Sequence, residues 1–565
     1  MPHLAPYPLA GLLARAFAEL DRNGSIFDLP RHRFSFCGRN ERGLDTRVAI
    51  HGRTVDAPLG PSAGPHTQLA QGIVLCWLGG GRFMELKTVQ HNDSIRIPRP
   101  CIDVRGIGLN VEWSQELRIE ESLEEYVKAA MLIEILARHF GVAPGCLLDM
   151  SVGYDLDGVR SDRMVAFMRG LVDARGTIDR LRRELPARWR DLDFNAAVSS
   201  SVTLSTFHGC PVSEIERTAD FLMSEIGVDC AIKLNPTLLG RAPLLEILHD
   251  RLGYTTLRVP TGAFDNDPNW DQTVDIVERL RVRARELGRS FAVKLTNTLV
   301  VENQSNFLPA SEKLAYLSGP PLHVLAMHLV RRFRHTFGHS LPISFSAGID
   351  RRNYPDAVAL GLAPVTVCTD LLKPGGYARM HAYGVELEQR MEAAGARTVA
   401  ELAHADIDVY VESLDRDPRY RHDQVEHVAR KTGFPLGLFD CSTCDLCISA
   451  CPNDANMRLR SLDCAIPFTR RHQIANFADF CNDCGNCETV CPDLGAPQRM
   501  KLRFFGSEES WRRHAPLDGF WIGPDVTRAR IDGAEYNDDS SHPLVQYARR
   551  AALDRSLINY INALQ

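Results

Sequence analysis

The chain has 565 residues, of which 44% are hydrophobic and 24% charged, and its formal net charge is −6 with 19 histidines counted as neutral. This composition is typical of globular proteins with a sizeable core, and the length exceeds one ordinary domain. The weak negative charge disfavours nucleic acid or an anionic membrane surface as a partner. No apolar run reaches the 18 residues of a membrane span.

The first 45 residues predict an N-terminal helical arm. Arg15 and Glu19 interrupt its apolar run, which favours an amphipathic helix over a signal peptide. The 16 cysteines include two clustered groups of four, and this distribution indicates metal ligation in a reducing compartment. We therefore expect a cytoplasmic protein.

Residues 46–400 alternate short β-branched runs with amphipathic helical stretches, which is typical of a parallel sheet or barrel. Eight such units predict an α/β fold, a TIM (β/α)8 barrel. Residues 115–195 are mostly helical, and we interpret them as an insertion between the second and third strands. The predicted strands are DAPLGPSA (56–63), RFMELKTV (82–89), SVTLSTF (201–207), CAIKLNP (230–236), TTLRVP (255–260), FAVKLT (291–296), LPISFSA (341–347) and APVTVCT (363–369). Helices are predicted over 122–140, 211–227, 270–288 and 322–337.

In such a barrel the functional residues lie at the carboxyl ends of the strands. Lysines, small residues and amides that converge there suit an anionic planar cofactor, since glycines let the backbone approach a phosphate. The strand ends carry Ser62, Ala63, Gly64, Lys87, Thr88, Thr206, His208, Asn235, Lys294, Asn297, Gly348 and Thr369.

Residues 436–504 contain CSTCDLCISACP and CNDCGNCETVCP, both with the spacing C-x2-C-x2-C-x3-C-P. This is the spacing of bacterial ferredoxins, in which three cysteines of one motif and the last cysteine of the other hold each [4Fe-4S] cluster. We expect a small ferredoxin-like α+β domain with two clusters. The predicted ligand sets are Cys441, Cys444, Cys447 and Cys491 for one cluster, and Cys481, Cys484, Cys487 and Cys451 for the other.

Other cysteine sites fit this spacing less well. A zinc ribbon needs two C-x2-C pairs and leaves two cysteines of each motif unexplained, and a disulfide knot is unusual beside a large core. Iron–sulfur clusters carry single electrons, so a two-electron organic reaction requires a cofactor that collects electrons in pairs.

Residues 401–435 predict a helical linker, and residues 505–565 a C-terminal extension. The extension is too short for another nucleotide-binding domain. The chain has no G-x-G-x-x-G between a strand and a helix, because GGGRF precedes a strand. Electrons that start on a pyridine nucleotide would therefore enter through a separate FAD and NAD(P)H-binding flavoprotein or another redox subunit.

The barrel region resembles the flavin domain of dihydroorotate and dihydropyrimidine dehydrogenases. The motifs that carry this resemblance are APLGPSAGPHT, GGGRFMELKTV, CAIKLNP, FAVKLTN, YLSGPPLHVLAM, FSAGID and VCTDLL. The chain is also similar to the N-terminal part of the selenate reductase subunit family, through SIFDLP, SVTLSTFHGCPVSEIER, KLNPTLLG and LLKPGGY. We take no substrate from that family's name.

The resemblance implies an FMN site and assigns roles at the strand ends. Ala63 and Gly64 would face the flavin ring, with Lys87 and the adjacent Thr88 at its polar edge. Lys294 would share this role and stabilise the anionic reduced flavin. Asn235 and Asn297 would contact the ring or substrate, and Gly348 and Thr369 would bind the phosphate. The alternative for each lysine is a side chain that extends from a strand end into solvent.

Two features depart from the pyrimidine-type pattern. Those enzymes carry a catalytic cysteine or serine after the fourth strand, whereas CAIKLNP, fourth in our prediction, is followed by no cysteine. The second departure is TTLRVP, which matches no family motif and leaves the strand number of Lys294 open.

His208 and Cys210 follow SVTLSTF and could instead donate the proton. A turn that merely ends the strand is the alternative, because Pro211 can begin the next helix. The sequence thus predicts an oxidoreductase subunit that passes electrons between two clusters and FMN, which acts on a small unsaturated, heterocyclic substrate. Alternatives are an electron-transfer or scaffold subunit without an organic substrate, or a flavin that only exchanges electrons between partners.

Overall fold

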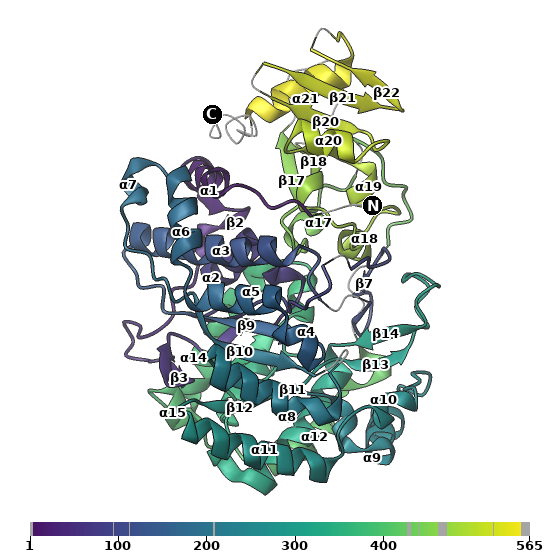
Figure 1. Cartoon of the computed structure of the whole chain (residues 1–565). Coiled ribbons are helices and arrows are strands. Elements are labelled where there is room, and N and C mark those ends of the chain that lie inside the picture. Colours follow the sequence, from purple (N-terminus) through teal and green to yellow (C-terminus); the bar gives the residue numbers. More distant parts are fainter. Residues whose placement is uncertain are drawn as a thin grey trace.

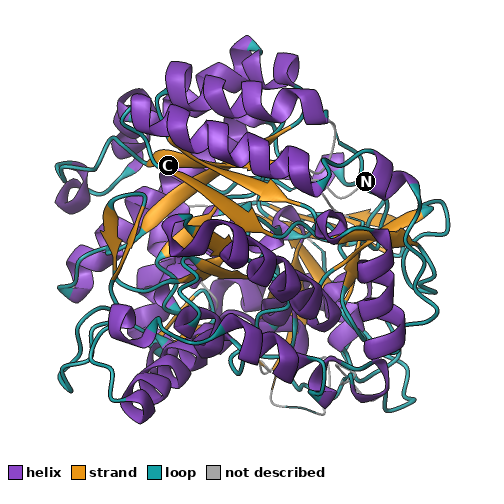
Figure 2. Ribbon diagram, turned by 90° about the horizontal axis from the view of Figure 1, so that it is seen from below, coloured by secondary structure: helices purple, strands orange, loops and turns teal. Residues whose placement is uncertain are grey.

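The computed structural model describes residues 4–93, 95–111, 114–206, 210–425, 431–439, 441–460, 470, 472–523, 525–538 and 540–554. Eight parallel strands form one sheet in the order β5-β16-β15-β12-β11-β10-β9-β6. The Arg82 N–H donates to the Leu59 carbonyl at 2.7 Å, which brings β6 against β5 and nearly closes the barrel. The predicted TIM barrel is confirmed (Figure 2). Its strands are β5 (Leu59–Pro61), β6 (Phe83–Glu85), β9 (Leu147–Gly153), β10 (Ser199–Ser205), β11 (Asp229–Leu234), β12 (Phe291–Leu295), β15 (Ile343–Phe345) and β16 (Val365–Val367).

Two of the strand predictions are wrong. Residues 255–260 (TTLRVP) form no strand, and the third barrel strand is β9, which lies inside the predicted insertion over 115–195. Asp149 interrupts the apolar run of β9. Inside the barrel its carboxylate accepts hydrogen bonds from Ser201 and Thr203, each at 2.6 Å. Residues 115–195 are thus two helical connections around a barrel strand, which makes β10 the fourth strand and β11 the fifth.

Helices surround the barrel, and the four predicted stretches are helical (Figure 1). Stretch 122–140 lies in α3, 211–227 in α8 and a following π-helical turn, 270–288 in α11 and 322–337 in α12. The helices of this region are α2 (Ala70–Leu78), α3 (Ile119–Phe140), α4 (Leu156–Arg160), α5 (Asp162–Val172), α6 (Arg175–Leu181), α7 (Ala187–Arg190), α8 (Val212–Phe221), α9 (Arg241–Leu245), α10 (Gly262–Asp265), α11 (Trp270–Glu286), α12 (Pro320–Phe337), α13 (Tyr354–Ala359) and α14 (Met380–Ala394).

A second, antiparallel sheet contributes residues to the mouth of the barrel. Its order is β13-β14-β8-β7, with β13 (Leu299–Glu302), β14 (Leu314–Leu317), β8 (Leu109–Asn110) and β7 (Ile102–Asp103). Since β7 and β8 follow the second barrel strand and β13 and β14 follow the sixth, this sheet joins two distant connections.

The N-terminal arm contains more than the predicted helix. Helix α1 (Leu9–Asn23) is followed by a short hairpin of β1 (Ser25–Ile26) and β2 (Leu29–Pro30). A second hairpin, of β3 (Val48–Ile50) and β4 (Arg53–Val55), lies after the predicted arm and before the first barrel strand. Arg15 of α1 forms a buried ion pair with Asp454, and the Ala5 N–H donates to the Asp479 carbonyl at 2.8 Å. The arm therefore connects the barrel to the cysteine-rich region.

After the barrel come α15 (Val399–Leu402) and α16 (Ile407–Leu414), at the start of the predicted linker. The cysteine-rich region and the C-terminal extension then share one six-stranded sheet, in the order β17-β18-β19-β20-β21-β22. The predicted boundary at 504 and 505 falls inside β19, so the extension enlarges the sheet of the cysteine-rich region. The strands are β17 (Asn456–Arg460), β18 (His472–Phe477), β19 (Leu502–Phe505), β20 (Gly519–Ile522), β21 (Thr527–Ile531) and β22 (Ala534–Tyr536). The helices are α17 (Leu446–Ser449), α18 (Asn486–Val490), α19 (Pro497–Met500), α20 (Glu508–Arg513) and α21 (Pro543–Asp554).

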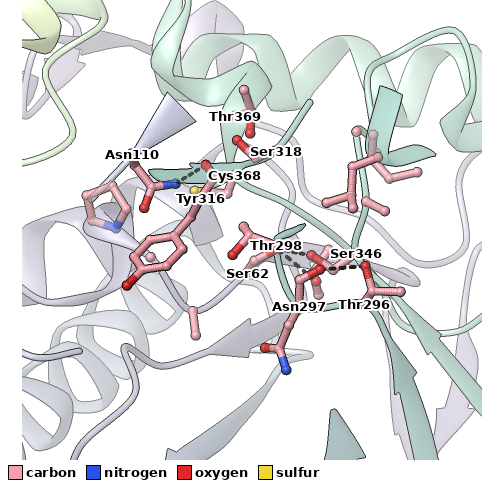
Figure 3. A pocket seen from close by; sticks show the side chains of 18 of the residues that line it. Ser62, Asn110, Thr296, Asn297, Thr298, Tyr316, Ser318, Ser346, Cys368 and Thr369 are labelled. Carbon is pink, nitrogen blue, oxygen red and sulfur yellow. Dashed lines mark hydrogen bonds between the residues drawn. The ribbon is translucent and has the colours of Figure 1, made fainter. Parts of the chain in front are cut away.

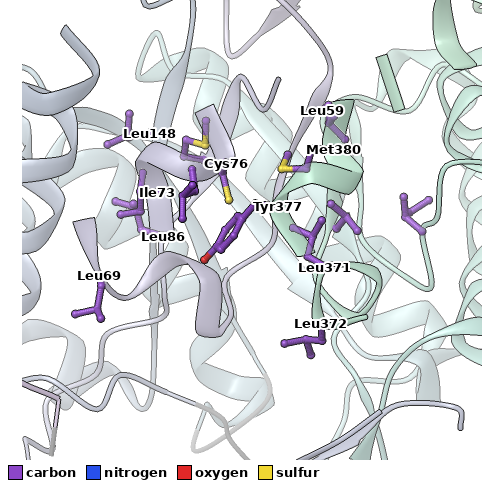
Figure 4. Close-up of a cluster of buried hydrophobic side chains, with 14 of the residues drawn as sticks. Leu59, Leu69, Ile73, Cys76, Leu86, Leu148, Leu371, Leu372, Tyr377 and Met380 are labelled. Carbon is purple, nitrogen blue, oxygen red and sulfur yellow. The ribbon is translucent and has the colours of Figure 1, made fainter. Parts of the chain in front are cut away.

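One hydrophobic core runs from the barrel into the cysteine-rich region. Figure 4 shows Ile73 and Cys76 of α2 packed near Tyr377 and Leu371. The Tyr377 hydroxyl donates to the Pro452 carbonyl, directly after Cys451. In the described part of the chain, no helix is both long and apolar enough to cross a membrane.

Candidate functional site

A cavity opens at the carboxyl ends of the barrel strands, where barrel enzymes place their active sites. It encloses about 1020 Å³ of empty space, including open solvent. Hydroxyl and amide side chains gather around it (Figure 3). Its lining includes seven of the nine predicted cofactor residues, namely Ala63, Gly64, Lys87, Thr88, Asn297, Gly348 and Thr369.

Asn235 and Lys294 lie behind this lining. The Asn235 side-chain amide donates to Asp267 at 2.6 Å, and its oxygen accepts from the Asn297 amide at 2.7 Å. Asn235 thus orients Asn297. The Lys294 side chain is fully buried, its ammonium group pairs with Glu85, and it donates to the Thr366 hydroxyl at 3.0 Å.

The sequence analysis missed a second lysine that reaches the cavity besides Lys87. Lys233 ends the fifth strand, lines the cavity and places its ammonium nitrogen 3.8 Å from Glu85 Oε1. Lys233 and Lys294 are register partners on adjacent strands and share the local sequence Lys-Leu, so the local pattern is the same for both. Both lysines face Glu85, the last residue of β6, but Lys294 is fully buried whereas Lys233 also lines the cavity.

The Glu85 carboxylate lies beneath the cavity and pairs with two lysines, Lys294 and Lys233. Burial alone would raise the pKa of this carboxyl group, but Lys294 and Lys233 outweigh that effect and leave the pKa below its ordinary value. Burial lowers the pKa of Lys233, and Glu85 offsets part of this shift. The Ala63 N–H also donates to Glu85 at 3.1 Å, so the charge network reaches a backbone segment of the cavity.

A row of hydroxyl groups connects the cavity wall with this ion pair. The Ser62 and Ser346 hydroxyl oxygens lie 2.6 Å apart, and Ser62 donates to Thr366 at 3.0 Å. Thr366 in turn accepts from Lys294. This row of hydrogen bonds links the cavity wall at Ser346 to the buried pair of Lys294 and Glu85.

Two glycines, Gly108 and Gly319, lie near Thr369 of the cavity lining, and Gly348 of the lining packs against Gly319. Gly108, Gly319 and Gly348 have φ values of +84°, +78° and +51°, which favour glycine. A Cβ on Gly319 would lie 2.2 Å from the Ile107 carbonyl oxygen, and one on Gly348 would lie 2.2 Å from the Gly319 carbonyl oxygen. Only glycine fits this cleft, and its close backbone and nearby hydroxyl suit a phosphate group.

Of the predicted catalytic pair, only Cys210 is among the described residues. His208 lies outside the described residues. Cys210 is buried and is not part of the described lining of the cavity, and burial, with Glu214 and Asp155, raises its pKa to about 12. It nevertheless follows the fourth barrel strand, because β10 occupies that position. The expectation that no cysteine follows the fourth strand is therefore wrong.

The eight motif cysteines line two further cavities. Cavity A, of about 310 Å³, is lined by Cys441, Cys444, Cys447 and Cys491. Cavity B, of about 270 Å³, is lined by Cys451, Cys481, Cys484 and Cys487. Among the described residues no three His, Cys, Asp or Glu side chains converge on a single-ion site. Four sulfurs spread around one space fit a cube whose irons each take their own thiolate, in the crossed sets that the spacing predicts.

Cavity B lies directly against the wall of the barrel cavity. The Cys484 carbonyl accepts hydrogen bonds from the N–H groups of Cys101 and Ile102, at 2.9 and 3.1 Å. On the other side, the Asn486 side-chain amide donates to the Leu372 carbonyl at 2.9 Å. Both Ile102 and Leu372 line the barrel cavity. A single lining residue therefore lies between Cys484 and the barrel cavity, and another between Asn486 and the barrel cavity.

The barrel matches a known family. The model of the oxidoreductase YgfK N-terminal TIM-barrel domain covers residues 33–422. The chain belongs to this oxidoreductase family. It is 36% identical over 482 residues to the candidate oxidoreductase YgfK of Escherichia coli (strain K12), and equally to that of strain O157:H7. These matches cover 79% of this chain but 45% of either YgfK protein, so the chain spans about half the length of these relatives.

Solved structures of DHODH from Eimeria tenella also resemble this chain. The complex with ferulenol aligns with a TM-score of 0.44 at 15% identity, over 71% of this chain and 96% of the other. The ligand-free form gives 0.43 at the same identity, over 69% and 96%.

Proposed function

We propose that this chain is an iron–sulfur flavoprotein subunit of an oxidoreductase. It would pass electrons between two [4Fe-4S] clusters and FMN in the barrel cavity, where a small unsaturated, heterocyclic compound is reduced or oxidised. The observation that carries the proposal is the contact of the Cys484 carbonyl with β7, because it puts a cluster-sized cavity against the wall of the barrel cavity.

The residues present fit FMN. Gly319, Gly348 and Thr369 would hold the phosphate, while Ala63 and Gly64 would lie against the ring. Lys87 and Lys233 would hold the polar edge of the ring; they are the charged residues among the described lining. When bound, FMN would supply hydride chemistry at the substrate and exchange electrons singly with the clusters.

Cavity B would hold the cluster nearer the flavin, and cavity A the cluster nearer the electron source. Cys444 in cavity A is exposed, whereas Cys484 and Cys487 in cavity B are buried. A separate FAD and NAD(P)H-binding flavoprotein, or another redox subunit, would exchange electrons at cavity A. Cys210 and His208 are the proposed proton donors, because both follow the fourth strand and Ser205 at its end lines the barrel cavity.

Anaerobic purification tests this proposal. Two clusters correspond to about eight irons and eight sulfides per chain, and acid treatment should release about one FMN. Lys233→Met should lower the FMN content because it removes a positive charge from the cavity, whereas Lys313→Met, at an exposed position, should not. Iron without flavin in the unaltered protein would contradict the FMN assignment.

A second function is favoured by the position of Cys210 away from the described cavity lining. The chain would then be an electron-transfer or scaffold subunit without an organic substrate of its own. In that case Cys210→Ala should leave electron transfer through the complex unchanged, and no substrate would reoxidise the reduced flavin faster than buffer alone.

A further inference from the structure

The two cysteine cavities differ in the side chains around them. Cavity A is lined by the charged residues Asp445, Asp493 and Lys501. The described lining of cavity B carries no charged residue and is instead rich in amides, namely Asn453, Asn456, Asn476, Asn482 and Gln498. All five amide residues are at most 3% exposed.

One strand supplies a residue to each cavity. Ile474 of β18 lines cavity A, and Asn476 lines cavity B. Residues two apart on a strand point to the same face, so these two side chains occupy comparable positions beside the two cavities. The side chain is apolar at cavity A and a hydrogen-bond donor at cavity B.

The Asn476 amide is held in place toward the cysteines. It lines cavity B together with Cys481, and its nitrogen donates to Asn456 Oδ1 at 3.0 Å. Asn456 in turn donates to the Cys447 carbonyl at 2.9 Å, and the two asparagines are register partners across β17 and β18. The bond to the Cys447 carbonyl fixes which end of the Asn456 amide is the donor, and this fixes the orientation of Asn476.

We propose that the Asn456–Asn476 pair raises the reduction potential of the cluster in cavity B and so holds an arriving electron on the flavin side. The inference rests on the proposed function, since it requires clusters in both cavities. One electron leaves cluster A, which is oxidised, and reduces cluster B. A donor N–H stabilises the added negative charge on the cluster sulfurs, and it acts more strongly in a buried site.

The charges around cavity A do not supply an equivalent donor. Asp445 is paired with Arg458 at 2.8 Å and with His472 at 2.7 Å. Asp493 accepts from the Ser442 hydroxyl at 2.8 Å, and Lys501 donates to the Gly437 carbonyl at 2.7 Å. The carboxylates are acceptors, and a negative charge near a cluster disfavours its reduction.

Redox titration of the anaerobic full-length protein, followed by electron paramagnetic resonance, tests the inference. Asn476→Leu keeps the shape of the side chain and removes its donor. We expect the reduced-to-oxidised ratio of one cluster to fall up to tenfold at the wild-type midpoint, and tenfold equals about 59 mV for one electron. Asp493→Asn should raise the midpoint of the other cluster alone, which assigns the two signals.

Asn456→Leu is the second variant, because it removes the partner that orients Asn476, together with the bond to the Cys447 carbonyl. It should shift the same cluster in the same direction by less. Iron and sulfide contents confirm that each variant keeps both clusters. Unchanged midpoints in both asparagine variants, or equal shifts of both clusters, would overturn the inference while the proposed function stands. Absence of iron and sulfide in the unaltered protein would overturn both.

Discussion

Replacing Glu85 with Gln should lower the free energy of unfolding, because it leaves the buried Lys294 ammonium group without its negatively charged partner. The Lys294 and Glu85 side chains are both 0% exposed, and Lys233 lies 3.8 Å from the other carboxylate oxygen. The Glu85→Gln substitution would keep the shape of the side chain and remove its negative charge. Removal of one partner from a buried ion pair costs about 3–5 kcal/mol, since the remaining ammonium group is buried without compensation.

The stability that the Glu85→Gln variant loses should become smaller as the pH rises. Burial lowers the pKa of Lys233 and Glu85 offsets part of this shift, so removal of Glu85 should lower that pKa further below the unfolded value of about 10.4. The unfolded chain then binds more protons, so the stability of the variant should rise with pH until it reaches that value. The wild-type protein should show a smaller rise, because Glu85 offsets part of the shift.

Urea unfolding followed by circular dichroism at pH 7 and pH 10 measures both effects. Glu216→Gln is the control, because it breaks an exposed pair with Arg279 and should cost less than about 1 kcal/mol. If Glu85→Gln matched this control at pH 7, or if its stability did not rise with pH, the assignment of Glu85 as the shared counterion would be refuted.

Three further variants test other parts of the molecule. Gly348→Ala would place a Cβ 2.2 Å from a backbone carbonyl and should abolish FMN retention in the folded protein. Gly288→Ala, with open space around it, should not. Equal flavin contents in the two variants would contradict the proposed phosphate site at Gly348. Arg15→Met leaves the Asp454 carboxylate buried and should lower the free energy of unfolding at pH 8 by about 3–5 kcal/mol. Because the pKa of Asp454 is raised to about 7 by burial, the carboxyl group takes up a proton below that pH and the penalty should shrink at pH 5; a constant penalty would argue against a buried carboxylate. Cys210→Ala should slow substrate turnover about 10²–10⁴-fold with unchanged flavin content if it is the acid, and an unchanged rate would remove it from the mechanism.

Much of the architecture was predictable because its signals are local. Seven of the eight barrel strands and the four main helices follow from hydrophobic periodicity, and the crossed sets of cysteines around cavities A and B follow from the motif spacing. Strand β9 was missed because Asp149 breaks the apolar run. Its carboxylate is tolerated only because Ser201 and Thr203 of the neighbouring strand donate to it.

The sequence by itself determined the chemistry that is available: paired cysteine motifs, lysines at strand ends, and glycines where a backbone must approach closely. The tertiary structure decided which of these groups meet. Lys233 faces the cavity and Lys294 is sequestered, although the two occupy register positions with the same local sequence. Glu85 from another strand is the counterion of both lysines, and β7 decides which cysteine cavity touches the barrel. Burial and ion pairing depend on neighbours that are distant in the chain, so no local pattern records them.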